Sequence, residues 1–154
     1  MASVRVQKGD FDPGAEAEAL ASGRTDVGAV VSFVGYCRDE DGSLAALELE
    51  HYPGMAEDEI ARATQEAEAR WPLLDVTVIH RHGRIAVGER IVLVAVAALH
   101  RGAAFKAAEM LMDYLKTRAP FWKRAIRADG AAEGWIEAKG DDDRSAARWS
   151  AADR

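Results

Sequence analysis

Residues 116–124 read Lys-Thr-Arg-Ala-Pro-Phe-Trp-Lys-Arg, and this stretch decides how the C-terminal part of the chain folds. Pro120 lacks a backbone N–H and disfavours helix at the residue before it, so a helix arriving from the N-terminal side is predicted to end near Arg118. Phe121 and Trp122 are large enough to pin the turn against a core. The stretch holds four cations and no acid, although the net charge of the chain is −6. We therefore expect a rigid, positively charged turn.

Two lysines flank this turn. Lys116 is expected on the last turn of the helix, and Lys123 is expected just beyond the proline, so that both face one pocket. A lysine on a rigid, partly apolar wall can have its pKa lowered and act as a base or nucleophile, or it can stay charged and hold an anion. Cations at a helix C-terminus can also do no more than complement the helix dipole. For an isolated lysine the dipole interpretation would be preferred; the clustering of cations in a rigid turn, together with the family resemblance described below, favours a functional site.

Length and composition indicate one soluble, globular domain. The chain has 154 residues, of which 49% are hydrophobic and 30% charged, enough to build a sizeable core. The acidic balance argues against a nucleic-acid binder, which usually has a basic face. The single cysteine, Cys37, excludes an internal disulfide and fits a reducing compartment. We expect no signal peptide and no membrane span, because the longest apolar run, Ile91–Leu99, is too short; the expected location is the cytoplasm.

Local patterns predict alternating strands and helices. A short helix is expected over Ala15–Ala21, with Asp12 as N-cap and Pro13 at the first helical position, and long helices over Met55–Trp71 and Ala103–Lys116. The expected strands lie around Val4 and Val6 and over Val27–Tyr36, Leu44–Tyr52, Val76–His80, Ile91–Leu99 and Trp135–Glu137. This order gives an α+β fold with a mixed or mainly antiparallel sheet and outer helices.

Several finer features follow from the same patterns. The segment Leu44–Tyr52 should pair antiparallel with Val27–Tyr36 through a short acidic turn, and the residues between Gly83 and Gly88 should form turns. Ile91–Leu99 is continuously apolar and should be buried on both faces. A short amphipathic tail, Ser145–Trp149, should pack its tryptophan on a partner. The inward residues of the helix Ala103–Lys116 should be Phe105, Ala108, Leu111, Met112 and Leu115.

Other polar residues stand at predicted strand ends. Arg38 follows one strand, and His100 and Arg101 follow another. Backbone N–H groups at such ends bind anions, arginine offers a two-pronged fork to phosphate or carboxylate, and histidine exchanges a proton near neutral pH. The same residues could instead form surface ion pairs with the many acids.

The sequence points to no metal and no cofactor. His51, His80 and His82 are the candidate metal ligands, but no cysteine or acid falls at a usual ligand spacing beside them. Cys37 has no neighbouring histidine or second cysteine and is interpreted as a packing residue. The chain has neither a P-loop nor a dinucleotide fingerprint.

Four stretches together resemble the large, catalytic subunit of molybdopterin synthase, the MoaE family. They are Leu49–Met55 (Leu-Glu-His-Tyr-Pro-Gly-Met), Val78–Arg81 (Val-Ile-His-Arg), His100-Arg101, and Met112–Lys123 (Met-Asp-Tyr-Leu-Lys-Thr-Arg-Ala-Pro-Phe-Trp-Lys). The resemblance covers the chain from about Val27 to Trp149, and the last stretch is highly specific.

The resemblance implies an α/β hammerhead-type fold over residues 1–154, with a peripheral tail from about residue 140. It implies a central homodimer, in which each copy binds a small ubiquitin-like sulfur-carrier subunit. The carrier's C-terminal Gly-Gly tail ends in a thiocarboxylate and enters a pocket of the large subunit. Two sulfurs are delivered in turn to cyclic pyranopterin monophosphate, which forms the dithiolene of molybdopterin.

The resemblance also implies site residues. The family's catalytic lysines fall on Lys116 and Lys123. Its substrate-contacting residues fall on Arg38, His100, Arg101 and Arg124, with backbone from Tyr36 and Cys37 nearby. One position departs from the family: Ala125 stands where many members have an acid, and Asp129 or Glu133 would have to replace that acid if it is needed.

Two other classes of function stay open from the residues alone. A binding module would hold a phosphorylated metabolite or a partner's C-terminal tail without chemistry, and its lysines would affect affinity only. A structural subunit would tolerate neutralisation of the cationic turn. Turnover by lysine variants separates both from a sulfurtransferase.

Overall fold

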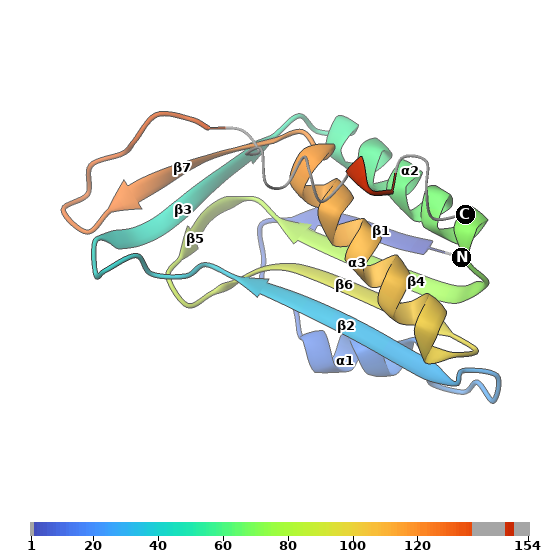
Figure 1. Cartoon of the computed structure of the whole chain (residues 1–154). Helices are drawn as coiled ribbons and strands as arrows, with labels where there is room; N and C mark the ends of the chain where they lie inside the picture. The colour runs from blue at the N-terminus through green and yellow to red at the C-terminus, as the bar shows by residue number, and fades with distance from the viewer. Residues whose placement is uncertain (1, 137–146, 150–154) are drawn as a thin grey trace.

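The computed structural model describes residues 2–136 and 147–149, and these residues form an α+β fold (Figure 1). The helices are α1 (Pro13–Ala19), α2 (Met55–Arg70) and α3 (Arg101–Thr117). The strands are β1 (Ala2–Gln7), β2 (Ala29–Tyr36), β3 (Leu44–His51), β4 (Leu73–Arg81), β5 (Gly83–Ala86), β6 (Arg90–Ala98) and β7 (Phe121–Arg127). The predicted fold class is confirmed, and Asp12 caps α1 as expected, with its side chain accepting from the N–H of Ala15.

The strands form two sheets instead of one. The larger sheet has the order β1-β4-β6-β2, and the smaller has the order β5-β3-β7. Among the described strands only β1 and β4 pair in parallel, so the mixed, mainly antiparallel character is confirmed. The smaller sheet extends away from the helices at the end where α3 finishes (Figure 1).

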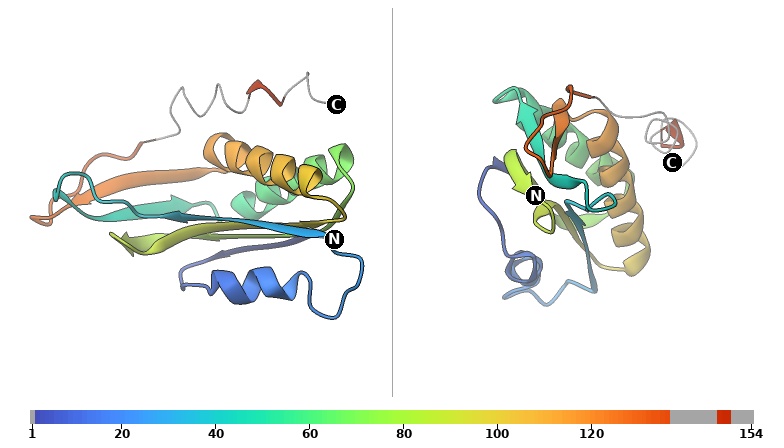
Figure 2. Two further views of the ribbon diagram at one scale, coloured as in Figure 1. Left: turned by 60° about the horizontal axis from the view of Figure 1, so that its bottom comes forward. Right: turned by 90° about the vertical axis from the view of Figure 1, so that its left-hand side faces the viewer.

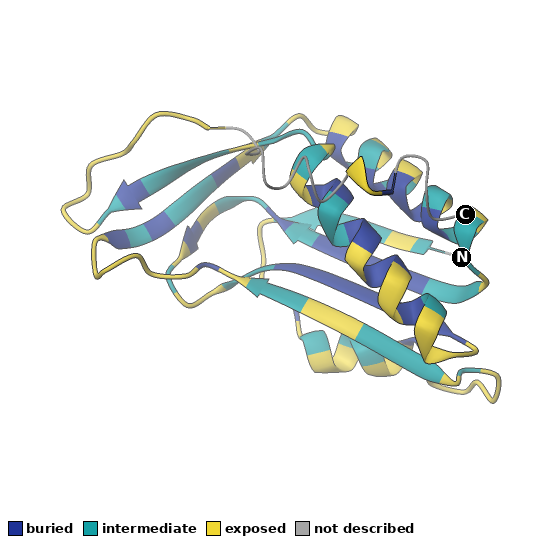
Figure 3. Ribbon diagram, in the orientation of Figure 1, coloured by how far each residue is buried: buried dark blue, intermediate teal, exposed yellow. Residues whose placement is uncertain are grey.

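Strand β6 is the centre of the molecule. Helices α2 and α3 cover one face of the larger sheet and α1 covers the other (Figure 2). Val92, Val94 and Val96 of β6 face α2 and α3, while Leu93, Ala95 and Ala97 face α1. The burial of β6 on both faces is therefore confirmed and is visible as a continuous buried ribbon (Figure 3).

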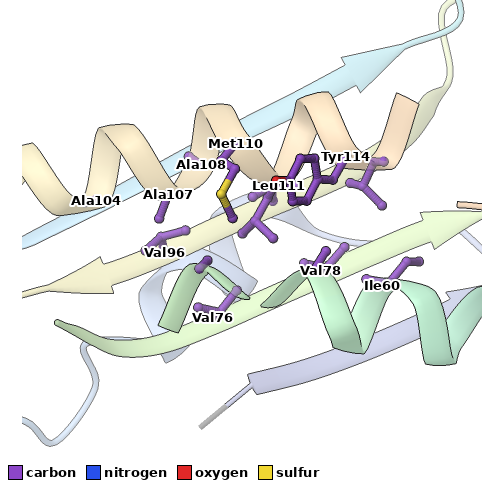
Figure 4. Close-up of a cluster of buried hydrophobic side chains, with 14 of the residues drawn as sticks. Ile60, Val76, Val78, Val96, Ala104, Ala107, Ala108, Met110, Leu111 and Tyr114 are labelled. Carbon is purple, nitrogen blue, oxygen red and sulfur yellow. The ribbon is translucent and has the colours of Figure 1, made fainter. Parts of the chain in front are cut away.

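The main core lies between the larger sheet and the two long helices. Alanines on α3, at 104, 107 and 108, let the helix approach the sheet closely, and Leu111 and Tyr114 fill the space beyond them (Figure 4). Phe105 was predicted to face inward, but 61% of its surface is exposed. Its position falls outside the stripe of small residues that contacts the sheet.

Two predictions about strands are wrong. Strand β3 does not pair with β2 and instead lies between β5 and β7. The chain after β2 stays bonded to the β5–β6 turn, since the N–H of Cys37 donates to the carbonyl of Glu89 at 2.8 Å. The segment between Gly83 and Gly88 contains β5, because Ile85 is fully buried and pairs opposite Leu47.

The end of the chain also differs from its prediction. The last strand is β7, which begins directly after Pro120, whereas Ile136 makes a single bridge to Lys123. The predicted strand residue Glu137 lies outside the described residues. The alternation of apolar and polar residues that predicts a strand is hard to see in β7, because three of its residues are cations.

Trp149 packs on its own chain and not on a partner. Only 4% of its surface is exposed, and its ring meets the ring of Trp71 edge-on at 5.8 Å. Its Nε1–H donates to a carboxylate oxygen of Asp113 on α3 at 2.6 Å. Ser145 and Ala146 of the predicted tail lie outside the described residues, and the single domain with a peripheral tail stays a prediction.

One glycine marks a close approach of two backbones. A Cβ added to Gly28 would lie 1.9 Å from the carbonyl oxygen of Leu99, where β2 begins beside the end of β6. We expect Gly28→Ala to lower the free energy of unfolding by about 1–3 kcal/mol, because the backbones must separate. Gly9→Ala is the matched control, since no atom lies within 4 Å of its added Cβ. Equal denaturation midpoints for the two variants would contradict this account.

Candidate functional site

Helix α3 ends where the proline predicted. The N–H of Arg118 donates to the carbonyl of Tyr114 at 2.7 Å as the last helical bond, and the Arg118 guanidinium lies over the Tyr114 ring at 3.8 Å. Arg118 also pairs with Glu66 of α2 at 2.7 Å. Lys116, one position short of the last helical residue, is exposed to solvent. Arg118 thus fixes the helix end and leaves Lys116 beside it.

Lys123 and Arg124 lie on opposite faces of β7, because side chains alternate along a strand. Lys123 stands opposite Leu49 and shares its face with Phe121. Arg124 pairs with Glu48 of β3 at 2.7 Å and lies over the ring of Trp135 at 4.4 Å. The structure therefore separates Arg124 from the face that carries Lys123.

A cluster of four rings joins the two sheets on the Lys123 side of β7. We call His80, Phe121, His51 and His82 the ring cluster. The ring of His80 is stacked on Phe121 with centroids 3.9 Å apart. The ring centroid of His51 on β3 lies 5.9 Å from that of Phe121 and 4.3 Å from that of His82. The sequence reading considered these histidines only as metal ligands and missed the contact with Phe121.

The environment of His80 keeps its imidazole neutral. Burial, followed by the charges of Lys116, His51 and His82, lowers the pKa of His80 from 6.5 to about 4, against the opposing effect of its bond to Arg81. That bond joins Nδ1 to the Arg81 carbonyl at 2.8 Å. A carbonyl only accepts, so Nδ1 carries the hydrogen and Nε2 keeps its lone pair. Lys116 is thus one of the charged groups that act on the His80 ring.

Tyr36, Cys37 and Arg38 lie at the same end of the larger sheet as Lys116. Tyr36 pairs with Arg90 at the start of β6, and α3 runs back to that end (Figure 1). Tyr36 and Arg38 are exposed, whereas Cys37 is 1% exposed and burial raises the pKa of its thiol. The Cys37 N–H is bonded to Glu89 and its carbonyl accepts from Gly88. Its backbone is thus already used within the chain.

His100 and Arg101 lie at the opposite end of the molecule. His100 is the N-cap position of α3, and Arg101 is the first helical residue. At a rise of about 1.5 Å per residue, Lys116 lies about 22 Å further along the helix. One chain therefore does not bring His100 and Arg101 to the two lysines.

The two acids proposed to compensate for Ala125 are engaged elsewhere. Asp129 accepts from the N–H of Ala131 at 2.9 Å, and Glu133 accepts from the Nε–H of Arg127 at 2.7 Å. Both bonds hold the loop that follows β7. Through these contacts, neither Asp129 nor Glu133 supplies the carboxylate that many family members have next to Lys123 and Arg124.

In the described residues, neither a metal site nor the surface depression at the start of α2 involves Lys116 or Lys123. Within residues 2–136 and 147–149, no group of three or more histidine, cysteine or acidic side chains is placed to hold a metal ion. No helix in this part of the chain is long and apolar enough to cross a membrane. An open depression at the start of α2 is lined by Tyr52, Met55, Arg62 and Arg118 among others, but neither lysine lines it.

Fold and site together define a class: a small α+β protein that gathers exposed cations at the junction of two sheets, suited to an anionic ligand. The sequence profile described as "MoaE protein" matches residues 6–118. The molybdopterin synthase catalytic subunit of Mesorhizobium japonicum is 64% identical over 147 residues, which cover 96% of this chain and 92% of that protein. This chain belongs to the MoaE family.

Solved structures agree with this assignment. A MoaE protein from Burkholderia ambifaria superposes with a TM-score of 0.84 at 47% identity, covering 99% of this chain and 100% of that one. A complex of subunits 1 and 2 of molybdopterin-converting factor from Helicobacter pylori contains a chain with a TM-score of 0.68, covering 89% of this chain and 90% of that one. At 22% identity, that second likeness concerns the fold alone.

The neutral state of His80 makes stability depend on pH. Its pKa of about 4 in the folded protein lies below its ordinary value of 6.5, so between these pH values only the unfolded chain binds the proton. The free energy of unfolding should therefore fall as pH drops from 6.5 to 4, by about 3 kcal/mol from this residue. Denaturant titrations of the wild type and His80→Phe across this range measure the effect. Parallel pH curves for the two proteins would show that His80 is not the cause.

Proposed function

We propose that this chain is the catalytic subunit of a molybdopterin synthase. It transfers sulfur from the thiocarboxylated C-terminus of a small ubiquitin-like carrier to cyclic pyranopterin monophosphate and so forms the molybdopterin dithiolene. The observation that carries the proposal is 64% identity, over nearly the full length of both chains, to a protein named as that subunit. The single cysteine of the chain supports a reducing, cytoplasmic setting.

Lys116 and Lys123 are the proposed catalytic residues. Both lysines are related to the stacked rings of His80 and Phe121. Lys123 shares the strand face of Phe121, and Lys116 acts electrostatically on the His80 ring. The pterin carries a cyclic phosphate and the carrier tail is an anion, so both are attracted to this end of an otherwise acidic protein. Lys116 supports attack at the thiocarboxylate, where a cation stabilises the oxyanion, and Lys123 holds the pterin or the tail.

The site is completed by a second copy of the chain. Arg38 lies near the lysine end, but His100 and Arg101 lie about 22 Å away along α3. Strand β2 is an edge of the larger sheet, about 26 Å long, and runs between these two ends. A two-fold axis that pairs this edge with itself would set His100 and Arg101 of one copy near Lys116 of the other.

Exposed apolar residues support such a dimer. Phe33 and Tyr36 on β2 are 43% and 54% exposed, and Leu99 and Phe105 at the start of α3 are 46% and 61% exposed. Helix α3 packs directly on β2, so the two elements that carry or adjoin these residues are neighbours. Large exposed hydrophobic side chains on adjoining elements mark an interaction surface.

The first test of the function is a reconstitution. Purified protein is mixed with a thiocarboxylated carrier and cyclic pyranopterin monophosphate, and dithiolene formation is followed. We expect Lys116→Ala and Lys123→Ala each to lower turnover by about 100-fold or more, because each removes a charge at the reacting groups. Lys106→Ala, an exposed lysine on the same helix, is the control and should keep wild-type turnover. Full turnover by both site variants would exclude the assignment, and lost affinity with unchanged turnover would indicate a binding module.

The shared site is tested by mixing inactive variants. A dimer of one Lys116→Ala chain and one Arg101→Ala chain keeps one intact site, so random mixing should restore about a quarter of wild-type activity. The matched control mixes Lys116→Ala with Lys123→Ala, which should stay inactive because both lysines come from the same chain. Recovery in neither mixture would place Arg101 in the same chain's site, and wild-type activity of Arg101→Ala alone would place it outside the site.

A further inference from the structure

We propose that His80 and Phe121 form a positioning pair, whose stacked rings fix Lys123 of the smaller sheet relative to Lys116 of α3. The inference rests on the proposed function, because it concerns the placement of the two proposed catalytic lysines. It adds two residues to the site that touch no reacting group themselves and act through the lysines.

The two lysines belong to different parts of the fold. Lys116 is carried by α3, which packs on the larger sheet, and Lys123 is carried by β7, which pairs with β3 in the smaller sheet. The backbone between them, Arg118 to Pro120, is neither helix nor strand. The connecting segment alone therefore does not set how the two amines face each other.

The stacked rings supply a direct contact between these parts. His80 stands on β4 in the row Val76, Val78, His80, which faces the long helices, and it lies at the end of the row nearest the C-terminus of α3. Phe121, the first residue of β7, is stacked on its ring at 3.9 Å with an interplanar angle of 16°. Near-parallel rings at this distance attract each other beyond the effect of their buried area.

Further contacts hold both rings in place. The Arg81 carbonyl fixes the rotation of the His80 ring through Nδ1 at 2.8 Å. On the other strand, His51 of β3 stands opposite Phe121 in the register and lies 5.9 Å from it. Phe121 thus neighbours a ring of the larger sheet and a ring of the smaller one. Lys123 follows two residues later on the same face of β7.

A neutral ring suits this position. The charged and titratable groups acting on His80 are Lys116 from α3, His51 from β3 and His82 beyond β4. An imidazolium here would repel Lys116 and weaken the stack. The neutral imidazole instead provides a rigid flat surface beside the lysine without adding a competing charge.

The test asks whether the flat shape of the two rings is what positions the lysines. His80→Phe and Phe121→Tyr keep a flat ring, whereas His80→Leu and Phe121→Leu remove one. Two quantities are measured: kcat and KM for the carrier, and the yield of a Lys116–Lys123 link formed by a short amine-reactive aryl cross-linker and identified by peptide mass. Phe11→Leu is the control for a lost aromatic ring, because Phe11 is buried in the cluster on the α1 face.

We expect the leucine variants to lose about 10- to 100-fold in kcat with little change in KM, as for a small misplacement of catalytic groups. Their cross-link yield should fall in parallel, while His80→Phe, Phe121→Tyr and Phe11→Leu keep both. The proposal is overturned if folded His80→Leu keeps wild-type kcat and cross-linking. It is also overturned if the wild type forms no Lys116–Lys123 link, or if His80→Phe loses as much kcat and cross-linking as His80→Leu. If Lys116→Ala keeps full turnover while the cross-link still depends on the rings, the proposed catalytic role fails and the positioning contact stands.

Discussion

The structure depends on the burial of β6 on both faces. A strand without a polar side needs cover on both sides of its sheet, and α2, α3 and α1 provide it. This constraint places α3 antiparallel to β6, so the helix begins at the strand's end and finishes at its start. The lysine end of α3 is thereby brought to the edge where the larger sheet meets the smaller one.

The smaller sheet sets the surroundings of Lys123, one of the two proposed catalytic residues. It carries Lys123 on one face and the Arg124–Glu48 ion pair on the other, so neighbouring cations in the sequence have different surroundings. The ring cluster fills the junction between the sheets, and burial keeps its member His80 neutral by lowering the pKa of that residue. The cationic end of α3 and the half-buried Lys123 beside this junction suit an anionic ligand.

Two groups of proposed site residues are far apart within one chain. His100 and Arg101 belong to the start of α3, and the length of the helix keeps them away from Lys116 in the same copy. A rigid helix does not bend to close such a gap. The residues that the family resemblance groups into one site therefore lie at two ends of one chain, which is why the proposed site takes His100 and Arg101 from a second copy.

Most elements of the fold were predictable from sequence, because they depend on local rules. Pro120 ended α3, Asp12 capped α1, and the apolar run of β6 implied burial on both faces. The predicted lysine pair also followed from a local cluster of charge and a specific stretch of residues. By contrast, Phe105 and Trp149 were misplaced, because the side of a helix that meets a sheet, and the surface that a tail covers, depend on distant elements.

The sequence by itself determined the fold class, the helices, most strands and the candidate lysines, since periodicity, proline and charge act over a few residues. The tertiary structure alone decided that there are two sheets, that β3 lies between β5 and β7, and that His80 stacks on Phe121. It also decided which face of β7 each cation occupies and how far Lys116 lies from Arg101. These features join residues far apart in the chain, and no local pattern encodes which strand edges or rings will meet.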